Sequence, residues 1–490
     1  MRADALRARL EASGNVVGWP AGVPERFVAV TTDSRSVSAG ALFMAYVGAT
    51  QDGHAYLGAA RERGATAALV ERPVPEVPLP QIQVARGRSA AAEAAALFYG
   101  DPARALRLLA VTGTNGKTTT VHLLRHLFGD AAPAASIGTL GAIDAAGRLL
   151  PGTGSLTTPG PVELQATLAA LVQGGARTLA METSSHSLDQ DRLGGLTFAA
   201  AVYTNFTRDH LDYHPDEASY LAAKLKLSGY LAEGGWEVVN ADEPAWRALA
   251  ARERRLTFGI ENAADARAGA IAGDQKGSRF DLTARGRTVS VTLPLIGRFN
   301  VENALGAIAA TLAVRADEGL TVEQVAVRLA TTPQVPGRME RIAEQPCVVL
   351  RDYAHTPDAL ERAIGAVRPL TTGRLLLVFG CGGDRDKGKR PVMGEIAARG
   401  ASVAIVTSDN PRTEDPERII DDIEDGMGAT PHLRIADRRK AIARAVSMAR
   451  ADDTILLAGK GHETYQVIGR ERLPFDEADV VRAAVAAMGT

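Results

Sequence analysis

Cysteine is scarce in this sequence, which holds only Cys347 and Cys381 among its 490 residues. The two lie far apart, in apolar or glycine-rich surroundings, and not at a paired spacing. A disulfide framework or a zinc site is therefore not expected.

Long apolar runs and an excess of charge of one sign are also missing. No uninterrupted apolar segment approaches the ~20 residues of a membrane span, and the N-terminal segment MRADALRARLEASG is too polar for a signal peptide. The 55 Lys and Arg residues nearly balance the 57 Asp and Glu residues, so no global basic field attracts nucleic acid or anionic lipid. We expect a cytoplasmic protein with no nucleic-acid partner and no membrane insertion, which binds any anionic ligand locally.

The composition, 46% hydrophobic and 23% charged, is typical of a folded globular protein. Because domains usually contain ~100–200 residues, the length indicates about three domains. We predict an N-terminal domain over 1–102, a central domain over 103–335 and a C-terminal domain over 336–490, with linkers near 100–104 and 333–340.

Each predicted domain has an α/β pattern. Apolar strands at 27–30, 41–48 and 67–70 indicate a small N-terminal α/β domain, and the four prolines of 71–81 exclude a helix interior there. In the centre, strand 106–111, a glycine loop and a helix from 119 begin an alternation typical of a parallel sheet covered by helices.

The last domain repeats strand, polar loop and helix four times, with strands at 347–351, 374–379, 401–406 and 454–458. Ligands of open parallel sheets bind outside the carboxyl ends of the strands. The four charged loops are therefore predicted to converge on one cleft.

The segment TGTNGKTT, 112–119, lies between a predicted strand and a predicted helix. Its backbone N–H groups and the helix N-terminus can cradle phosphate, with Lys117 neutralising the terminal phosphates and the Thr118 hydroxyl as a candidate magnesium ligand. The standard phosphate-loop pattern begins with glycine, whereas Val111 stands at that position here.

This departure matches a known family. TGTNGKTT resembles the phosphate loop of the Mur ligases and the folylpolyglutamate synthetases. The resemblance to the Mur ligases extends over nearly the whole chain, through DSR (33–35), TTP (157–159), ETSSHSLDQDR (182–192), NFTRDHLDYH (205–214), YLAAKLK (220–226), NVENALGA (300–307), VPGRME (335–340), DYAHTPD (352–358), GGDRDKGKR (382–390), DNPRTEDP (409–416) and GKGHET (459–464).

The resemblance implies a small N-terminal UDP-binding domain, a central P-loop ATPase-like parallel sheet and a C-terminal Rossmann-like domain. It also implies an ATP-dependent ligase of peptidoglycan synthesis. Such an enzyme would join an amino acid, here meso-diaminopimelate, to UDP-N-acetylmuramoyl-L-alanyl-D-glutamate, and we expect it to be a monomer.

The resemblance implies four catalytic residues, Lys117, Glu182, His210 and Lys224. Glu182 and His210 follow predicted strands near the phosphate loop, where a carboxylate and an imidazole suit a magnesium ion that bridges ATP and an acyl group. The implied metal ligands are Thr118, Glu182, His210 and a carbamylated Lys224.

Apolar neighbours in its helical segment can lower the pKa of Lys224, and a neutral amine can take up carbon dioxide. Lys226 is close enough in sequence to be the alternative, and an exposed helix lysine is the simpler interpretation of either.

Residues for ATP and for the UDP substrate follow from the matched motifs. The resemblance implies that ATP is bound by Gly113, Thr114, Asn115, Gly116, Lys117, Thr118, Thr119, Asn303, Arg338, Asp352 and His355. It implies that the UDP-muramyl dipeptide is bound by Thr32, Ser34, Thr157, Thr158, Ser184, Gln190 and Arg192. Without the resemblance, Ser34 could equally belong to a turn and Asn303 to an ordinary helix. We interpret Asp209, Asp212 and His214 as ordinary loop residues.

Diaminopimelate carries a second amino-carboxylate end, and a guanidinium fork matches a carboxylate at two points. Arg385 and Arg412, both in loops at strand ends, are therefore the candidates for acceptor selectivity. The full predicted acceptor set is Arg385, Asp409, Asn410, Pro411, Arg412, Gly459 and Glu463. If the segment DNPRT, 409–413, were only a turn followed by a helix cap, this would explain its Asn-Pro pair and Thr413 but not Arg412.

These expectations define one reaction and two alternatives. The γ-phosphate of ATP passes to the terminal carboxylate of the muramyl dipeptide, and the amine of diaminopimelate attacks the resulting acyl phosphate, releasing ADP and phosphate. The first alternative is a ligase that adds lysine or glutamate, including a folylpolyglutamate synthetase. The second is a P-loop regulatory protein that hydrolyses ATP to exchange partners.

Overall fold

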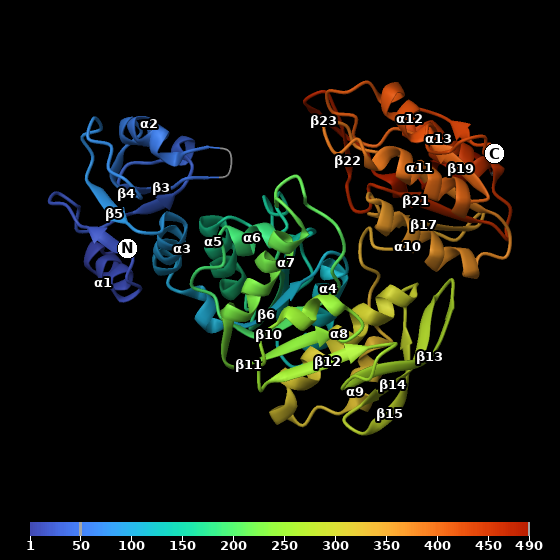
Figure 1. Cartoon of the computed structure of the whole chain (residues 1–490), viewed down its shortest axis with the longest axis horizontal. Coiled ribbons are helices and arrows are strands. Elements are labelled where there is room, and N and C mark those ends of the chain that lie inside the picture. Colours follow the sequence, from blue (N-terminus) through green and yellow to red (C-terminus); the bar gives the residue numbers. More distant parts are fainter. Residues whose placement is uncertain (49–50, 489–490) are drawn as a thin grey trace.

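The computed structural model describes residues 1–48 and 51–488. They form three α/β bodies that lie in a row along the chain, as Figure 1 shows in blue, green to yellow, and orange to red. A five-stranded, a ten-stranded and a six-stranded sheet form the centres of these bodies, and a separate two-stranded hairpin belongs to the last. The predicted α/β fold class is confirmed.

The first body contains a sheet in the order β1-β5-β4-β3-β2, parallel except for β1. The proline-rich segment that cannot be helical leads into β5, which lies inside the sheet. Helix α3 closes this body and packs on α5 of the next. The elements are α1 Ala3–Ala12, β1 Val16–Gly18, β2 Ala29–Thr31, β3 Ala41–Ala45, α2 Leu57–Glu62, β4 Ala65–Val70, β5 Gln81–Val84 and α3 Gly87–Phe98, with 3-10 helices at Ser34–Ser36, Gly53–Tyr56 and Pro102–Ala105.

The central body has a parallel sheet with antiparallel pairing at both edges, in the order β15-β14-β13-β12-β11-β10-β6-β9-β7-β8. Its elements are β6 Arg107–Thr112, α4 Lys117–Phe128, β7 Ala134–Gly138, β8 Gly141–Ile143, α5 Pro161–Gln173, β9 Thr178–Glu182, α6 Ser185–Asp189, β10 Phe198–Tyr203, α7 Glu217–Leu225, β11 Leu231–Asn240, β12 Arg255–Gly259, β13 Ala266–Asp274, β14 Gly277–Ala284, β15 Arg287–Leu293, α8 Arg298–Val314 and α9 Val322–Leu329. Shorter 3-10 helices are Lys226–Tyr230, Pro244–Ala248 and Ala316–Glu318.

Burial on both faces explains why the central strands are apolar throughout. Every residue of β6 after Arg107 is buried, as a parallel sheet covered by helices requires. On one face α4 packs against α8, whose many alanines allow it to lie close to β10, β11 and β12. The phosphate loop thereby begins at the end of a fixed central strand.

The C-terminal body has the strand order β16-β17-β21-β18-β19-β20, and only β16 is antiparallel. Its elements are β16 Glu340–Ala343, β17 Val348–Asp352, α10 Pro357–Val367, β18 Leu375–Phe379, α11 Lys389–Gly400, β19 Val403–Val406, α12 Pro416–Glu424, β20 Leu433–Arg434, α13 Arg438–Met448, β21 Thr454–Ala458, β22 Tyr465–Ile468, β23 Glu471–Pro474 and α14 Glu477–Met488, with a 3-10 helix at Arg368–Leu370. The four predicted strands all occur, and their polar loops leave the same edge of the sheet.

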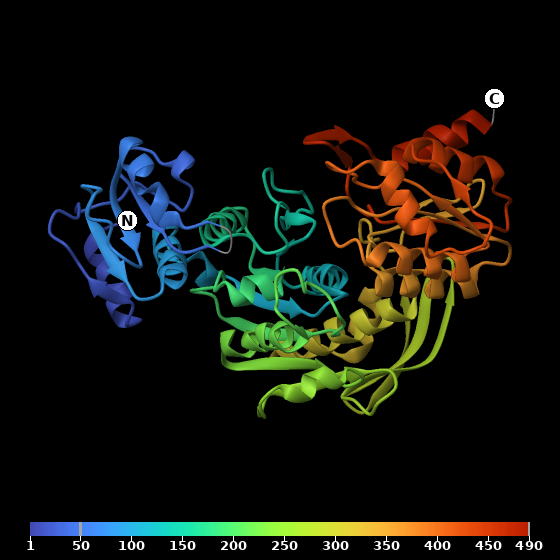
Figure 2. The same ribbon diagram turned by 45° about the horizontal axis from the view of Figure 1, so that its top comes forward.

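Hydrogen bonds join the central and C-terminal bodies at several places. The β13–β14 hairpin rises toward the C-terminal body (Figure 2), where the Gln275 amide donates to the Leu370 carbonyl at 3.3 Å and the Arg341 guanidinium donates to the Gln275 carbonyl at 3.2 Å. On the other side, Asn115 of the phosphate loop donates to Asp358 of α10 at 3.1 Å. The last body is thus held over the phosphate loop.

None of the helices formed by residues 1–48 and 51–488 is long and apolar enough to cross a membrane.

Candidate active site

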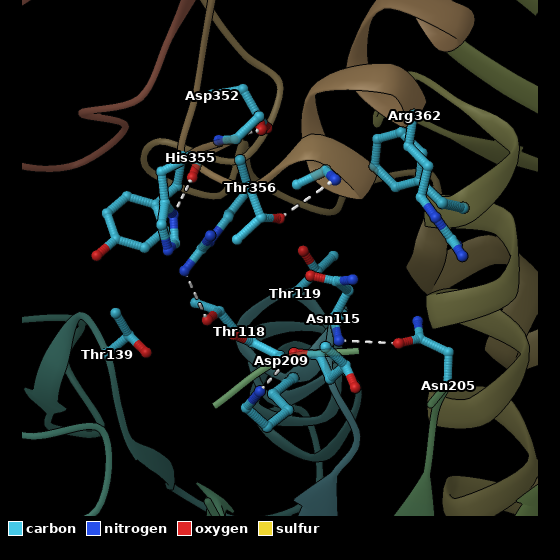
Figure 3. A pocket seen from close by; sticks show the side chains of 18 of the residues that line it. Asn115, Thr118, Thr119, Thr139, Asn205, Asp209, Asp352, His355, Thr356 and Arg362 are labelled. Atoms are coloured by element: carbon cyan, nitrogen blue, oxygen red, sulfur yellow. Dashed lines mark hydrogen bonds between the residues drawn. The ribbon is translucent and has the colours of Figure 1, made fainter. Parts of the chain in front are cut away.

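A cavity of about 270 Å³ lies between the phosphate loop, the start of α8 and the loop after β17. Figure 3 shows side chains from both bodies pointing into it, among them Asn115 and Thr118 from below and Asp352, His355 and Thr356 from above. Its walls are formed by Thr114, Asn115, Gly116, Lys117, Thr118, Thr119, Thr139, Thr157, Glu182, Asn205, Asp209, His210, Phe299, Asn303, Arg338, Asp352, Tyr353, Ala354, His355, Thr356, Ala359, Arg362 and Ala363.

The phosphate loop requires glycine at two positions. Gly113 and Gly116 have φ values of 142° and 85°, which L side chains rarely adopt. A Cβ atom at Gly116 would also overlap the Asn303 amide, and one at Gly113 would overlap the Thr204 hydroxyl. The backbone therefore turns sharply from β6 into α4 and leaves the first N–H groups of that helix available for an anion.

Two lysine amines meet at this loop. Lys117 Nζ donates to the carbonyl oxygens of Gly113 at 3.0 Å and Thr114 at 2.7 Å, and Lys224 Nζ donates to the same Gly113 oxygen at 2.7 Å. Burial lowers the pKa of Lys117, whereas the nearby carboxylates of Glu182 and Asp209 act to raise it. Burial, reinforced by the nearby Lys117 ammonium, holds the pKa of Lys224 well below its usual range.

Lys224 and Lys226 have different surroundings, although only two positions separate them. The Lys224 residue is 1% exposed and its amine lies 4.4 Å from the Tyr220 ring centre, beneath the phosphate loop and outside the cavity wall. Lys226 keeps 47% of its side chain exposed and pairs with Asp189. Burial gives Lys224 the depressed pKa that carbamate formation needs.

The predicted metal ligands Thr118, Glu182 and His210 all face the cavity. Glu182 is 1% exposed and accepts hydrogen bonds from the Thr139 N–H and hydroxyl, while burial lowers the pKa of His210. Within residues 1–48 and 51–488, no group of three His, Cys, Asp or Glu side chains is arranged to hold a metal ion. Hydroxyl, carboxylate and neutral imidazole fit magnesium only with further oxygens, such as those of a triphosphate.

The predicted nucleotide residues converge, with the exception of Gly113, which lies behind the cavity wall. Arg338 donates to the Thr118 hydroxyl at 3.1 Å, and its buried Nε–H has no acceptor among the described residues. Asp352, whose pKa burial raises, accepts hydrogen bonds from the Met339 and Ala354 N–H groups. An unsatisfied buried guanidinium N–H at the cavity suits an anionic ligand.

Sequence reasoning missed part of this wall. Asp209, interpreted as an ordinary loop residue, lines the cavity, and so do Phe299, Tyr353 and Arg362. Phe299 begins α8, and Arg362 lies one turn into α10, so neither stands in a motif with obvious chemistry. Only their place beside NVENALGA and DYAHTPD could have indicated them.

Five residues predicted for the UDP substrate lie together in the central body. Thr157 faces the cavity, and the buried Thr158 hydroxyl donates to the Glu182 carbonyl at 2.9 Å. Arg192 donates to the Thr158 carbonyl at 2.8 Å and to the Gln190 amide oxygen at 2.7 Å, and Ser184 caps α6. Thr32 and Ser34 lie on the first body, beyond the carboxyl end of β2, apart from this group.

The predicted acceptor residues gather on the C-terminal loops. Gly382 is flanked by both selectivity candidates, since a Cβ atom there would lie 2.9 Å from Arg412 Nη1 and 3.9 Å from Arg385 Cγ. Arg412 has φ 52° and donates to the Gly383 carbonyl at 2.7 Å, whereas Arg385 is exposed. The buried Asp409, Asn410 and Pro411 form the rest of this loop.

Sequence reasoning also missed Lys460, which lies between Gly459 and Glu463. The Lys460 side chain is fully buried, and its amine lies 3.3 Å from Asp409 Oδ1 and 3.6 Å from Glu463 Oε2. It donates to Asn410 Oδ1 and to the Tyr465 carbonyl, both at 2.9 Å. A Cβ atom at Gly459 would lie 2.7 Å from Asp409 Oδ2, so this strand end has room only for glycine.

Comparison with known proteins agrees with this geometry. Three family models match in chain order: "Mur ligase family, catalytic domain" over 26–99, "Mur ligase middle domain" over 111–311 and "Mur ligase, glutamate ligase domain" over 337–461. A curated relative from Gloeobacter violaceus is 42% identical over 93% of this chain and 93% of its own, and one from Synechococcus sp. is 44% identical over 98% of each. The chain belongs to the Mur ligase family.

Both relatives are named UDP-N-acetylmuramoyl-L-alanyl-D-glutamate–2,6-diaminopimelate ligase. Among solved Mur ligases, one bearing the same name has a TM-score of 0.67 and 33% identity, and the comparison covers 95% of this chain and 96% of that one. The Mycobacterium tuberculosis folylpolyglutamate synthase complexed with ADP, 18% identical, has a TM-score of 0.62 over 81% of this chain and 94% of its own, and shows a common fold.

Proposed function

We propose that this Mur ligase joins meso-diaminopimelate to UDP-N-acetylmuramoyl-L-alanyl-D-glutamate in peptidoglycan synthesis, at the cost of one ATP. The observation that carries the proposal is the pairing of a phosphate-loop cavity with a loop cluster that presents Arg385 and Arg412 around Gly382. The names of the full-length relatives support the same acceptor and the same muramyl substrate.

In this proposal the phosphate loop and Lys117 bind the triphosphate, and Arg338 binds it from the opposite wall. Transfer of the γ-phosphate to the dipeptide carboxylate gives an acyl phosphate, and the attacking amine displaces phosphate to form the amide. The protein residues mainly orient the reactants and offset the charge that develops on the transferred group.

Magnesium fits the donor set of Thr118, Glu182 and His210, and when bound it would neutralise charge on the phosphate oxygens. The buried amine of Lys224, whose pKa burial depresses, is the group available for carbamate formation beside the loop. The muramyl dipeptide would be bound at the other side of the cavity by Thr157, Thr158, Ser184, Gln190 and Arg192. The uridine end would be bound by Thr32 and Ser34.

The acceptor would lie on the C-terminal loops. Arg385 and Arg412 would bind carboxylate, and Gly459 and Glu463 would receive the ammonium end. The loop itself would be shaped by Asp409, Asn410 and Pro411. A cytoplasmic location, where ATP and UDP-linked precursors are found, and a monomeric state belong to the same proposal.

Phosphate release tests the function directly. ATP and the UDP-muramyl dipeptide are supplied with diaminopimelate, with lysine or with no acceptor. We expect release with diaminopimelate only. Release that does not depend on an acceptor would contradict the ligase assignment, and equal use of lysine would contradict the role given to Arg412.

A further inference from the structure

The loop that carries Arg412 runs beside the β22–β23 hairpin, Tyr465–Pro474. The Arg412 N–H donates to the Val467 carbonyl at 3.1 Å, and the Gly469 N–H donates to the Arg412 carbonyl at 2.7 Å. Arg412 and Ile468 form a parallel β-bridge, the pairing that two adjacent strands would make. Both backbone groups of Arg412 are thus bonded to the hairpin.

This pairing matters because the Arg412 backbone is strained. Its φ of 52° lies in the left-handed region, which is unfavourable for a residue with a side chain. Such a conformation persists only where surrounding contacts enforce it. The side chain starts from this backbone, so the hairpin also fixes the direction in which the guanidinium leaves the loop.

Three side chains strengthen the same connection. Gln466 of β22 donates from Nε2 to the Asp409 carbonyl at 2.6 Å, and the Val467 N–H donates to Asn410 Oδ1 at 2.9 Å. The buried Lys460 amine donates to Asn410 Oδ1 and to the Tyr465 carbonyl, so it binds the loop and the hairpin at once. The loop is therefore bonded to the hairpin at Asp409, Asn410 and Arg412.

We propose that the β22–β23 hairpin, acting through Gln466 and Lys460, positions the 409–412 loop and thereby sets how strongly the enzyme discriminates diaminopimelate from lysine. This inference rests on the proposed function. Two-point binding of a carboxylate by a guanidinium tolerates little displacement, so a loosened loop would weaken binding of the acceptor end that lysine lacks.

Gln466 is the better residue to change. Its side chain is half-buried and uncharged, whereas Lys460→Met would leave Asp409 and Glu463 facing each other in the interior, and the variant could fail to fold. Gln466→Ala removes the donor to the Asp409 carbonyl. Gln466→Glu keeps the shape of the side chain but cannot donate. Glu471→Ala, at an exposed position on the same hairpin, is the matched control.

The experiment measures kcat and KM for ATP, diaminopimelate and lysine with each variant. We expect Gln466→Ala to raise the KM for diaminopimelate by about tenfold, as the loss of one well-placed hydrogen bond would, with the KM for ATP unchanged. The preference for diaminopimelate over lysine should fall by a similar factor. Gln466→Glu should behave like Gln466→Ala or worse, and Glu471→Ala should match the parent enzyme.

An equal rise in the KM for ATP would show general damage to the fold and would overturn the inference. An unchanged preference for diaminopimelate in both Gln466 variants would overturn it as well. In either case the proposed function stands if the parent enzyme releases phosphate only with diaminopimelate. A parent enzyme that shows no dependence on an acceptor would instead refute the proposed function itself.

Discussion

The nucleotide end and the acceptor end of this enzyme are built in different ways. The proposed nucleotide end depends on backbone: one loop of four residues between β6 and α4, 113–116, offers N–H groups and two glycines with positive φ. The proposed acceptor end depends on side chains, since Lys460 and Gln466 donate hydrogen bonds to Asn410 and Asp409, in the distant loop that carries Arg412. Local sequence therefore specifies the first site, and the assembled fold specifies the second.

The largest expected effect lies at the nucleotide end, in Lys224→Ala. Loss of a charge-stabilising group of this kind should lower kcat on the order of 10²- to 10³-fold, and a short carboxylic acid should restore part of the activity by replacing the carbamate. Acceptor-dependent phosphate release measures both effects.

Lys226→Ala is the control for that substitution, because Lys226 is exposed and paired with Asp189. It should leave kcat nearly unchanged. If Lys224→Ala were fully active, or if the two variants lost activity equally, the role given to Lys224 would be wrong.

An intermediate effect is expected at the acceptor end. Arg412→Lys keeps the charge but loses the planar fork, so the KM for diaminopimelate should rise on the order of 10- to 100-fold while the KM for ATP stays constant. Steady-state kinetics with each substrate varied in turn would show this separation. A matching rise in the KM for ATP would mean that the two ends are not independent.

This contrast also explains what the sequence could predict. Apolar runs and local motifs predicted the phosphate loop, the strands β2, β3, β4 and β6 and the four parallel strands β17, β18, β19 and β21, and the structure contains them. β1 was missed because its three residues carry no pattern, and β5 because the prolines before it concealed a short strand.

The sites divide along the same line. Motifs indicated Asn303, Arg338 and Arg412, although their roles stay predictions. They did not indicate Phe299, Arg362, Lys460 or Gln466, since a phenylalanine, an arginine, a lysine and a glutamine in isolation carry no signal for a site. Their places depend on contacts between elements distant in the sequence, such as α8 with α10 around the cavity, or the loop after β19 with β22.

The smallest effect concerns the support beneath the acceptor loops. The buried Arg390 pairs with Glu414 at 2.9 Å and with Asp422 at 2.7 Å, and its hydrogen bonds lower the pKa of Glu414 from 4.5 to about 2. Ionised Glu414 therefore stabilises the fold fully above about pH 4.5, and this contribution is lost as the pH falls toward 2.

Glu414→Gln should consequently destabilise the C-terminal body by about 1–3 kcal/mol at pH 7, with a difference from the parent that narrows below pH 4.5. Urea unfolding at several pH values measures it. Glu361→Gln, which breaks an exposed pair with Arg399, should change stability by less than about 1 kcal/mol. A constant difference at every pH would contradict the role given to the Arg390 pair.

Competition between acceptors tests the central claim most directly. The enzyme receives ATP, the UDP-muramyl dipeptide and equal concentrations of diaminopimelate and lysine, and mass spectrometry counts the two possible tripeptide products. Because the site is built around an arginine that must bind a carboxylate, the diaminopimelate product should exceed the lysine product by on the order of 100-fold or more. Equal amounts of the two products, or ATP hydrolysis without either, would contradict the account.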